Sequence, residues 1–254
     1  MSHRSWLAPT LLGAFLLVGW WITAASGRFP AFVMPHPLNV AKRAVQELTG
    51  PYLWGYLGNT LAEALVGCLV GLSAALPLAY LIYKSTWANA AVQPFLGATQ
   101  AIPAVALAPL LLLWMGSGLR AIVTLCALMV FFPILVTTTV GLRHLDRDLI
   151  DAAKLDGAWG WTMLRSIEAP LVLPSMMAGL RNGFTLSITG AVVGEMVMGG
   201  HGMGTLITLQ SHNVDTTGMF VSLLIICTIA AIAYGLIYQA ERRSKTIAAL
   251  TTQR

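Results

Sequence analysis

The chain has 254 residues, of which 57% are hydrophobic and 10% are charged, and its formal net charge is +5. Soluble domains usually carry about 25% charged residues, so this composition excludes an ordinary soluble protein and fits a chain dissolved in a lipid bilayer. The basic residues lie mostly between apolar stretches, which fits orientation in a membrane better than a nucleic-acid-binding surface. We therefore expect membrane lipid, and no nucleic acid, as a partner.

Six apolar segments have the length of about 20 residues that a helix needs to cross the hydrocarbon core. In chain order these segments are Leu7–Ala25, Thr60–Tyr83, Val92–Met115, Arg120–Gly141, Ser175–Met198 and Thr217–Gln239. The first is longer than the apolar part of a signal peptide and is expected to remain as a spanning helix. The third contains Pro94, Pro103 and Pro109, so it is expected to be bent or broken. The sequence predicts an all-α integral membrane protein with about six transmembrane helices.

Two connections between these segments are long. Residues 26–59 start with a proline-rich stretch and continue with an amphipathic helix over Asn39–Leu48, which is expected to lie on the membrane surface. Residues 142–174 are helical in pattern and unusually polar for this chain. The predicted units are 1–58 with the first helix, external loop and interfacial helix, 59–240 with a five-helix core that contains the 142–174 loop, and the tail 241–254.

The basic residues predict the orientation of the chain. With the N-terminus inside, eleven Lys and Arg residues lie on the cytoplasmic side and four outside. Short cytoplasmic loops carry an excess of Lys and Arg, so this arrangement is strongly favoured over its reverse. Both termini and the polar 142–174 loop are therefore predicted to be cytoplasmic.

The polar loop has the pattern of a helix, a tight turn and a second helix. Ala152, Ala153 and Gly157 lack bulk, so another protein could approach the backbone closely there. Gly157 stands where the end of a helix needs a positive φ. The second helical stretch is expected to end before Pro170 and Pro174. The sequence predicts a helix–turn–helix at the inner face of the membrane.

This loop resembles the cytoplasmic "EAA" loop of ABC importer permeases, which reads Glu-Ala-Ala, three residues, Gly, nine residues, Ile, one residue, Leu-Pro. The spacing matches throughout, and the corresponding positions are Asp151-Ala152-Ala153, Gly157, Ile167 and Ala169-Pro170. Asp151 stands in place of the Glu and keeps its charge, and Ala169 stands in place of the Leu. The residues expected to couple to an ATPase are therefore Asp151, Ala152, Ala153, Gly157, Ile167 and Pro170.

Further motifs are similar to the nitrate/sulfonate/taurine-type branch of that family, from about Asn59 to the end of the chain. They are Ala101-Ile102-Pro103, Leu113-Trp114-Met115-Gly116, Phe131-Phe132-Pro133-Ile134, Gly179-Leu180-Arg181 and Gly194-Glu195-Met196. Candidate residues of a translocation path are Ile102, Pro103, Glu195 and Arg181. Carboxylates within a membrane often mark a pathway, but Glu195 and the similar Glu63 could also cap a helix or pair with a neighbour. Arg181 could equally reach the headgroups.

The resemblance implies a multi-pass protein of the bacterial inner membrane and a set of partners. Two permease copies, expected to form a homodimer, would enclose a path, and two cytoplasmic ABC ATPase subunits would bind the EAA loops. An extracytoplasmic binding protein would deliver the solute. The chain has no Gly-x-x-x-x-Gly-Lys-[Ser/Thr] phosphate loop, so ATP and Mg are expected on the partner ATPase. We expect no catalytic residues, no metal site and no cofactor in the chain itself.

Two alternative functions and several solutes remain to be weighed against an importer permease. An ion-coupled secondary transporter would usually show inverted repeats with broken helices in matching positions, and only one broken span is evident. A membrane-embedded enzyme would need clustered His or carboxylate residues, which the sequence lacks. The implied solutes are sulfonates, taurine, nitrate or a pyrimidine/thiamine-type vitamin precursor. The stretch Gly190–Met196, followed by a Gly-rich turn, is slightly more similar to the permeases of the vitamin-precursor subgroup.

Overall fold

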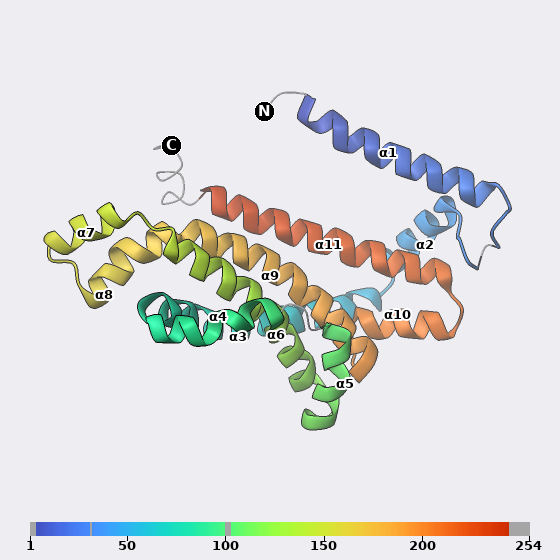
Figure 1. The fold of residues 1–254 in the computed structure, drawn as a ribbon. Coiled ribbons are helices and arrows are strands. Elements are labelled where there is room, and N and C mark those ends of the chain that lie inside the picture. The colour runs from blue at the N-terminus through green and yellow to red at the C-terminus, as the bar shows by residue number, and fades with distance from the viewer. Residues whose placement is uncertain (1–3, 31, 100–102, 244–254) are drawn as a thin grey trace.

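The computed structural model describes residues 4–30, 32–99 and 103–243, and these residues form helices and no strand. The helices are α1 (Arg4–Ala25), α2 (Pro37–Thr49), α3 (Leu53–Lys84), α4 (Thr86–Thr99), α5 (Ala104–Met115), α6 (Leu119–Arg143), α7 (Arg147–Leu155), α8 (Gly160–Met163), the π-helical turn η1 (Leu164–Glu168), α9 (Ala169–Met198), α10 (Met203–His212) and α11 (Thr216–Arg243). They form an elongated bundle with α7 and α8 at one end and α2 and α10 toward the other (Figure 1). The predicted all-helical class is confirmed.

Each predicted apolar segment coincides with helical structure. The helices α1, α3, α6, α9 and α11 match one segment each, and the third segment corresponds to the two separate helices α4 and α5. The expected break in that segment is confirmed. Pro103 caps α5 in an extended conformation, whereas Pro94 and Pro109 lie inside their helices.

Among the described residues, three helices are long and apolar enough to cross a membrane, namely α3, α6 and α11. The stretch Gly160–Met198 gives a fourth crossing together with α10, although the two are bent by 47° at the turn between them. The apolar part of α1 over Thr10–Ala25 and helix α5 are shorter. Six crossings therefore require the shorter helices to take part as well.

The core of the bundle is formed where α6 packs between α3 and α9. Ile122, Leu125 and Cys126 of α6 are fully buried there. Small residues let the helix backbones approach closely, which is how helices associate in lipid. A Cβ added at Gly71 of α3 would lie only 2.7 Å from the carbonyl oxygen of Ala127, so this crossing requires glycine.

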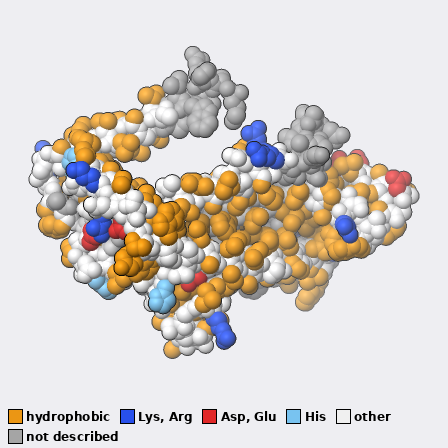
Figure 2. Space-filling model, turned by 180° about the vertical axis from the view of Figure 1, so that it is seen from behind, with side chains coloured by type: hydrophobic (Ala, Val, Ile, Leu, Met, Phe, Trp, Pro, Cys, Tyr) orange, Lys and Arg blue, Asp and Glu red, His pale blue; other side chains and the backbone are white. Residues whose placement is uncertain are grey.

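The outer surface is apolar over the length of the bundle. Figure 2 shows hydrophobic side chains covering the middle of this face, with charged side chains mostly toward its ends and edges. Exposed side chains on the long helices include Leu65 and Leu69 of α3 and Leu223 and Leu224 of α11. Helices that expose leucine along their length fit a lipid environment.

The N-terminal region lies against the end of the bundle that holds α10. Helix α2 covers the amphipathic segment expected over Asn39–Leu48, and it contacts the start of α11. Arg43 of α2 pairs with Asp215, at 3.1 Å, just before α11. Trp20 of α1 stacks on Phe220 of α11 with ring centroids 5.8 Å apart. The first predicted unit, 1–58, is thus joined to the helical core by specific contacts.

One local prediction was wrong, and one helix was not predicted. The second helical stretch of the polar loop does not end before Pro170, because α8 continues through η1 directly into α9. Pro170 and Pro174 both lie within this continuous helical path, and the π-helical turn η1 comes just before Pro170, at the kind of irregularity that accompanies a proline in a helix. Helix α10 was not predicted at all, since it is short and follows a glycine-rich turn.

Candidate functional sites

The helix α7 carries the first of the candidate coupling residues and begins at a well-formed N-cap. The Asp146 carboxylate accepts a hydrogen bond of 2.9 Å from the backbone N–H of Asp148. Asp148 in the first turn and Lys154 in the last turn both complement the helix dipole. The helix therefore holds its shape largely through its own sequence.

The end of α7 is closed by Gly157, which has the predicted positive φ of +84°. The N–H of Gly157 donates to the carbonyl of Lys154, and that of Ala158 donates to the carbonyl of Ala153 at 2.9 Å. A left-handed residue after a helix satisfies its last carbonyls in this way. No atom lies within 4 Å of a Cβ added at Gly157, so the backbone there is open to a partner.

The surface around this turn is formed largely by small residues and by exposed apolar side chains. Asp151 and Ala152 are exposed on α7, and Leu155 has 90% of its surface exposed. Trp159 and Trp161 beside the turn are exposed as well. Exposed large apolar side chains beside small residues are typical of a surface that another protein covers.

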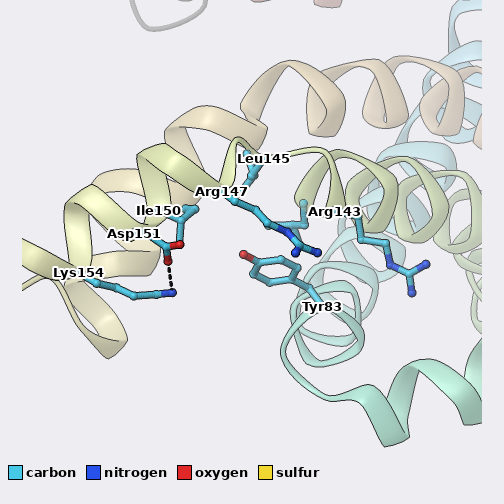
Figure 3. A pocket seen from close by; sticks show the side chains of 8 residues that line it. Tyr83, Arg143, Leu145, Arg147, Ile150, Asp151 and Lys154 are labelled. Carbon is cyan, nitrogen blue, oxygen red and sulfur yellow. Dashed lines mark hydrogen bonds and ion pairs between the residues drawn. The ribbon is translucent and has the colours of Figure 1, made fainter.

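A cavity of about 600 Å³ lies between α7 and the ends of α3 and α6. Figure 3 shows Tyr83 of α3 facing the Arg147 side chain, with Arg143 on the α6 side. The Asp151 carboxylate is engaged by Lys154 at 2.6 Å on the opposite wall. Lys154 is already paired with Asp151, and Arg143 is hydrogen-bonded to Asn89, so the Arg147 guanidinium is the group that suits this cavity to an acidic group from a partner.

The remaining coupling candidates lie on the segment that joins this surface to the membrane helices. Ile167 is half-buried in η1, which contacts α7, and half-buried Pro170 follows in the first turn of α9. Glu168, between them, is fully buried, and one of its oxygens accepts a 2.5 Å ion-paired hydrogen bond from Lys84 at the end of α3. This pair was not expected from the sequence. The available signal in the sequence was an isolated acidic residue next to one span and a lysine at the end of another.

The candidate path residue Glu195 lies near the other end of α9. It is 1% exposed, and its two oxygens accept hydrogen bonds from the Thr60 hydroxyl at 2.7 Å and the Gly204 N–H at 2.5 Å. The Thr60 hydroxyl oxygen accepts a further bond from the Met203 N–H at 2.8 Å. A Cβ at Gly202 would collide with the Glu195 carboxylate. The carboxylate is thus enclosed by the glycine-rich turn and supports it, as the capping alternative expected.

The other path candidates are not brought together with Glu195. Arg181 is half-buried near the middle of α9 and donates to the Glu241 carboxylate of α11 at 3.0 Å. Its guanidinium also lies over the rings of Tyr234 and Tyr238, at 4.8 and 5.2 Å. Pro103 is exposed at the start of α5, and Ile102 lies outside the described residues. Arg181 therefore ties α9 to α11, through a charge pair and cation–π contacts.

Residues 67–246 match the sequence family of binding-protein-dependent transport system inner membrane components. The chain is 43% identical over 227 residues to the riboflavin transport system permease protein of Chloroflexus aurantiacus, covering 89% of this chain and 85% of that one. It is 30% identical over 235 residues to the formylaminopyrimidine transport permease protein of Halalkalibacterium halodurans, covering 92% and 93%.

Among solved structures, the fold is similar to a chain of the MetNI methionine ABC transporter in an inward-facing conformation. The TM-score is 0.67 at 20% sequence identity, and the similarity covers 75% of this chain and 95% of that chain. At this identity the likeness concerns the helical architecture alone.

Proposed function

Since the chain belongs to the family of binding-protein-dependent transport system inner membrane components, and so is a membrane permease subunit of an ABC transporter, we propose that it imports a vitamin-type heterocycle. The solute is a flavin or a pyrimidine precursor, and a binding protein delivers it. The observation that carries this substrate class is the 43% identity to a riboflavin permease, supported by the 30% identity to a formylaminopyrimidine permease. Sulfonates, taurine and nitrate are the competing solutes.

Two copies of the chain form the path, and each docks one cytoplasmic ATPase subunit on the surface of α7. The exposed Ala152, the open backbone at Gly157 and the basic cavity beside Arg147 are the features that receive the ATPase. ATP and Mg are bound and hydrolysed on that partner. The chain itself supplies the docking surface and the moving helices.

Movement of the docked surface reaches the membrane helices along two routes. The first is the continuous helix from Gly160 to Met198 through η1 and α9. The second is the Lys84–Glu168 pair, which fastens η1 to the end of α3. Because the core of the bundle packs α6 between α3 and α9, both routes act on the same core.

The docking surface faces the cytoplasm, and both termini lie on that side. The distribution of eleven basic residues against four supports this orientation. Arg143 and Arg147 line the cavity beside α7 (Figure 3), and Lys84 ends α3 next to Tyr83 of the same cavity. The α2 and α10 end then faces the binding protein. An ion-coupled secondary transporter is disfavoured, since the family match extends over residues 67–246.

The docking proposal is tested by placing bulk on α7. Ala152→Trp, at an exposed position, is expected to abolish co-purification of the ATPase subunit and ATP-dependent uptake into proteoliposomes. Ala14→Trp, at an exposed position on α1, is the matched control and should leave both unchanged. Normal ATPase binding and uptake by the Ala152→Trp variant would contradict the proposal, as would accessibility labelling of α7 from the outer side.

A further inference from the structure

A second cavity, of about 520 Å³, lies where the ends of α3 and α6 meet α8, η1 and the start of α9. Among the residues that line it, Leu142 and Val172 are buried, whereas Pro77 and Trp161 are exposed, so the cavity opens on the surface of the bundle. It shares only Leu142 with the cavity beside Arg147. Its volume lies within the range of sites that hold small organic molecules.

The lining of this cavity changes from polar to apolar along the helices. Tyr80, near the end of α3, and Arg165 of η1 lie at the end toward α7. Leu76, earlier in α3, and Met176, further along α9, lie at the opposite end. The cavity therefore has a polar mouth and an apolar interior, which is the division of polarity within a phospholipid molecule.

The free positive charge at this mouth belongs to Arg165. This side chain is exposed and forms no hydrogen bond or ion pair with the part of the chain that the structure describes. Lys84, whose Nζ atom lies 5.3 Å from the centre of the Tyr80 ring, is already paired with the buried Glu168. A guanidinium binds phosphate oxygens well, and basic pockets between membrane helices on the cytoplasmic side bind anionic lipid headgroups.

The cavity lies at the depth where lipid headgroups are expected. Helix α3 has the length and composition of a membrane span and ends at Lys84, with Tyr80 and Tyr83 just before it. Of the two exposed tryptophans beside α7, Trp161 lines this cavity and Trp159 does not. Tyr and Trp gather at the membrane–water interface. With the orientation proposed above, this interface is that of the cytoplasmic leaflet, whose surface is negatively charged.

We propose that this cavity binds one anionic phospholipid of the cytoplasmic leaflet. The Arg165 guanidinium holds the headgroup phosphate, and an acyl chain fills the apolar part between Leu76 and Met176. The imported solute is a poorer occupant, because the Thr138 hydroxyl is shielded and the apolar wall would leave the polar atoms of a heterocycle unpaired. The lipid lies against η1, through which the docking surface is joined to α9. The inference uses the proposed orientation but not the proposed solute.

The test uses the complete transporter, with its ATPase subunits, in phosphatidylcholine vesicles that contain a small fraction of chain-brominated phosphatidylglycerol. Bromine quenches tryptophan fluorescence at short range, and the part due to Trp161 is the difference between each protein and its Trp161→Phe counterpart. Brominated phosphatidylglycerol is expected to quench Trp161 more strongly than brominated phosphatidylcholine at the same mole fraction. Arg165→Gln is expected to raise the fraction needed for half-maximal quenching by about fivefold, which corresponds to about 1 kcal/mol.

Two further variants separate the charge from the cavity. Arg243→Gln makes the same change of charge at an exposed position at the end of α11, outside the cavity, and should leave the quenching unchanged. Ala169→Leu fills part of the cavity and keeps Arg165, and it is expected to weaken quenching by brominated phosphatidylglycerol. Leu is the residue that the EAA pattern has at this position, so this variant is expected to fold.

Three outcomes would overturn the inference. Equal quenching of wild-type Trp161 by the two brominated lipids would mean that no headgroup is selected. Equal effects of Arg165→Gln and Arg243→Gln would reduce the preference to the general charge of the surface. Absence of quenching would mean that protein covers the cavity in the assembled transporter. Uptake of solute is not measured in this experiment, so a wrong substrate class would leave its result unaffected.

Discussion

At one end of the bundle α7 is held by its own caps and exposes most of its side chains, whereas at the other end Glu195 is enclosed by groups from three segments. Asp146 and Gly157 close α7 locally, and its Ile150 is its one buried residue. Glu195, in contrast, joins α9 to α3 through Thr60 and to α10 through Gly204. The first region can therefore bind or release a partner at little cost in its own stability, whereas a change of shape in the second would break buried hydrogen bonds.

The largest effect is expected where the enclosed region is overfilled. A side chain at Gly204 would collide with the carbonyl oxygen of Val192, so Gly204→Val is expected to destabilise the protein by about 3 kcal/mol. Gly235→Val is the control, because a Cβ there meets open space. The measurement is thermal unfolding in detergent. Equal stability of the two variants would show that the enclosed region is not rigid.

A smaller effect is expected at the joint between the two regions. Glu168→Ala removes a fully buried partner of Lys84 and should cost about 1–2 kcal/mol, since Lys84 is itself partly exposed. Lys84→Ala should cost a similar amount, and the double variant should cost less than the sum. A double-mutant cycle on unfolding, repeated on uptake, measures the coupling. Strict additivity would mean that the pair does not join η1 to α3.

A still smaller effect is expected at the turn that ends α7. Gly157→Ala places a side chain at φ +84° and should destabilise the turn by about 1 kcal/mol. Gly157→Asn should cost less, because Asn tolerates the left-handed region. Hydrogen exchange of the α7 amides measures the difference. Identical exchange in both variants and the wild type would place the cause of any docking defect outside the turn.

The smallest effect is expected on the exposed face of α7. Asp151→Asn breaks the pair with Lys154 but should change the free energy of unfolding by less than about 0.5 kcal/mol, since both groups are solvated. ATPase binding is the informative readout. A large loss of stability would contradict the view that α7 is held chiefly by its caps.

The predictable part of the molecule is the part governed by local patterns. Apolar length located the long helices, and small residues followed by glycine located α7 and its left-handed end at Gly157. These features depend on neighbours along the chain. Their position in the sequence is therefore sufficient to find them.

The missed features depend on contacts between distant segments. Glu168 pairs with Lys84, and Thr60 and Gly204 share Glu195, across separations that no local pattern encodes. The continuation of α8 into α9 was missed because Pro170 was taken to end a helix, although the helix continues past it after the π-helical turn η1. Helix α10 was missed because only a few apolar residues follow the turn.

The unbroken helical rod that leads from η1 into α9 has a mechanical consequence. Helix α9 alone has 30 residues, so it extends over about 45 Å at 1.5 Å per residue. If this helix pivots by about 5° about one end, the opposite end moves by about 4 Å, which is slightly more than the diameter of a water molecule. A small displacement near Pro170 is thereby magnified near Met198, at the opposite end of α9.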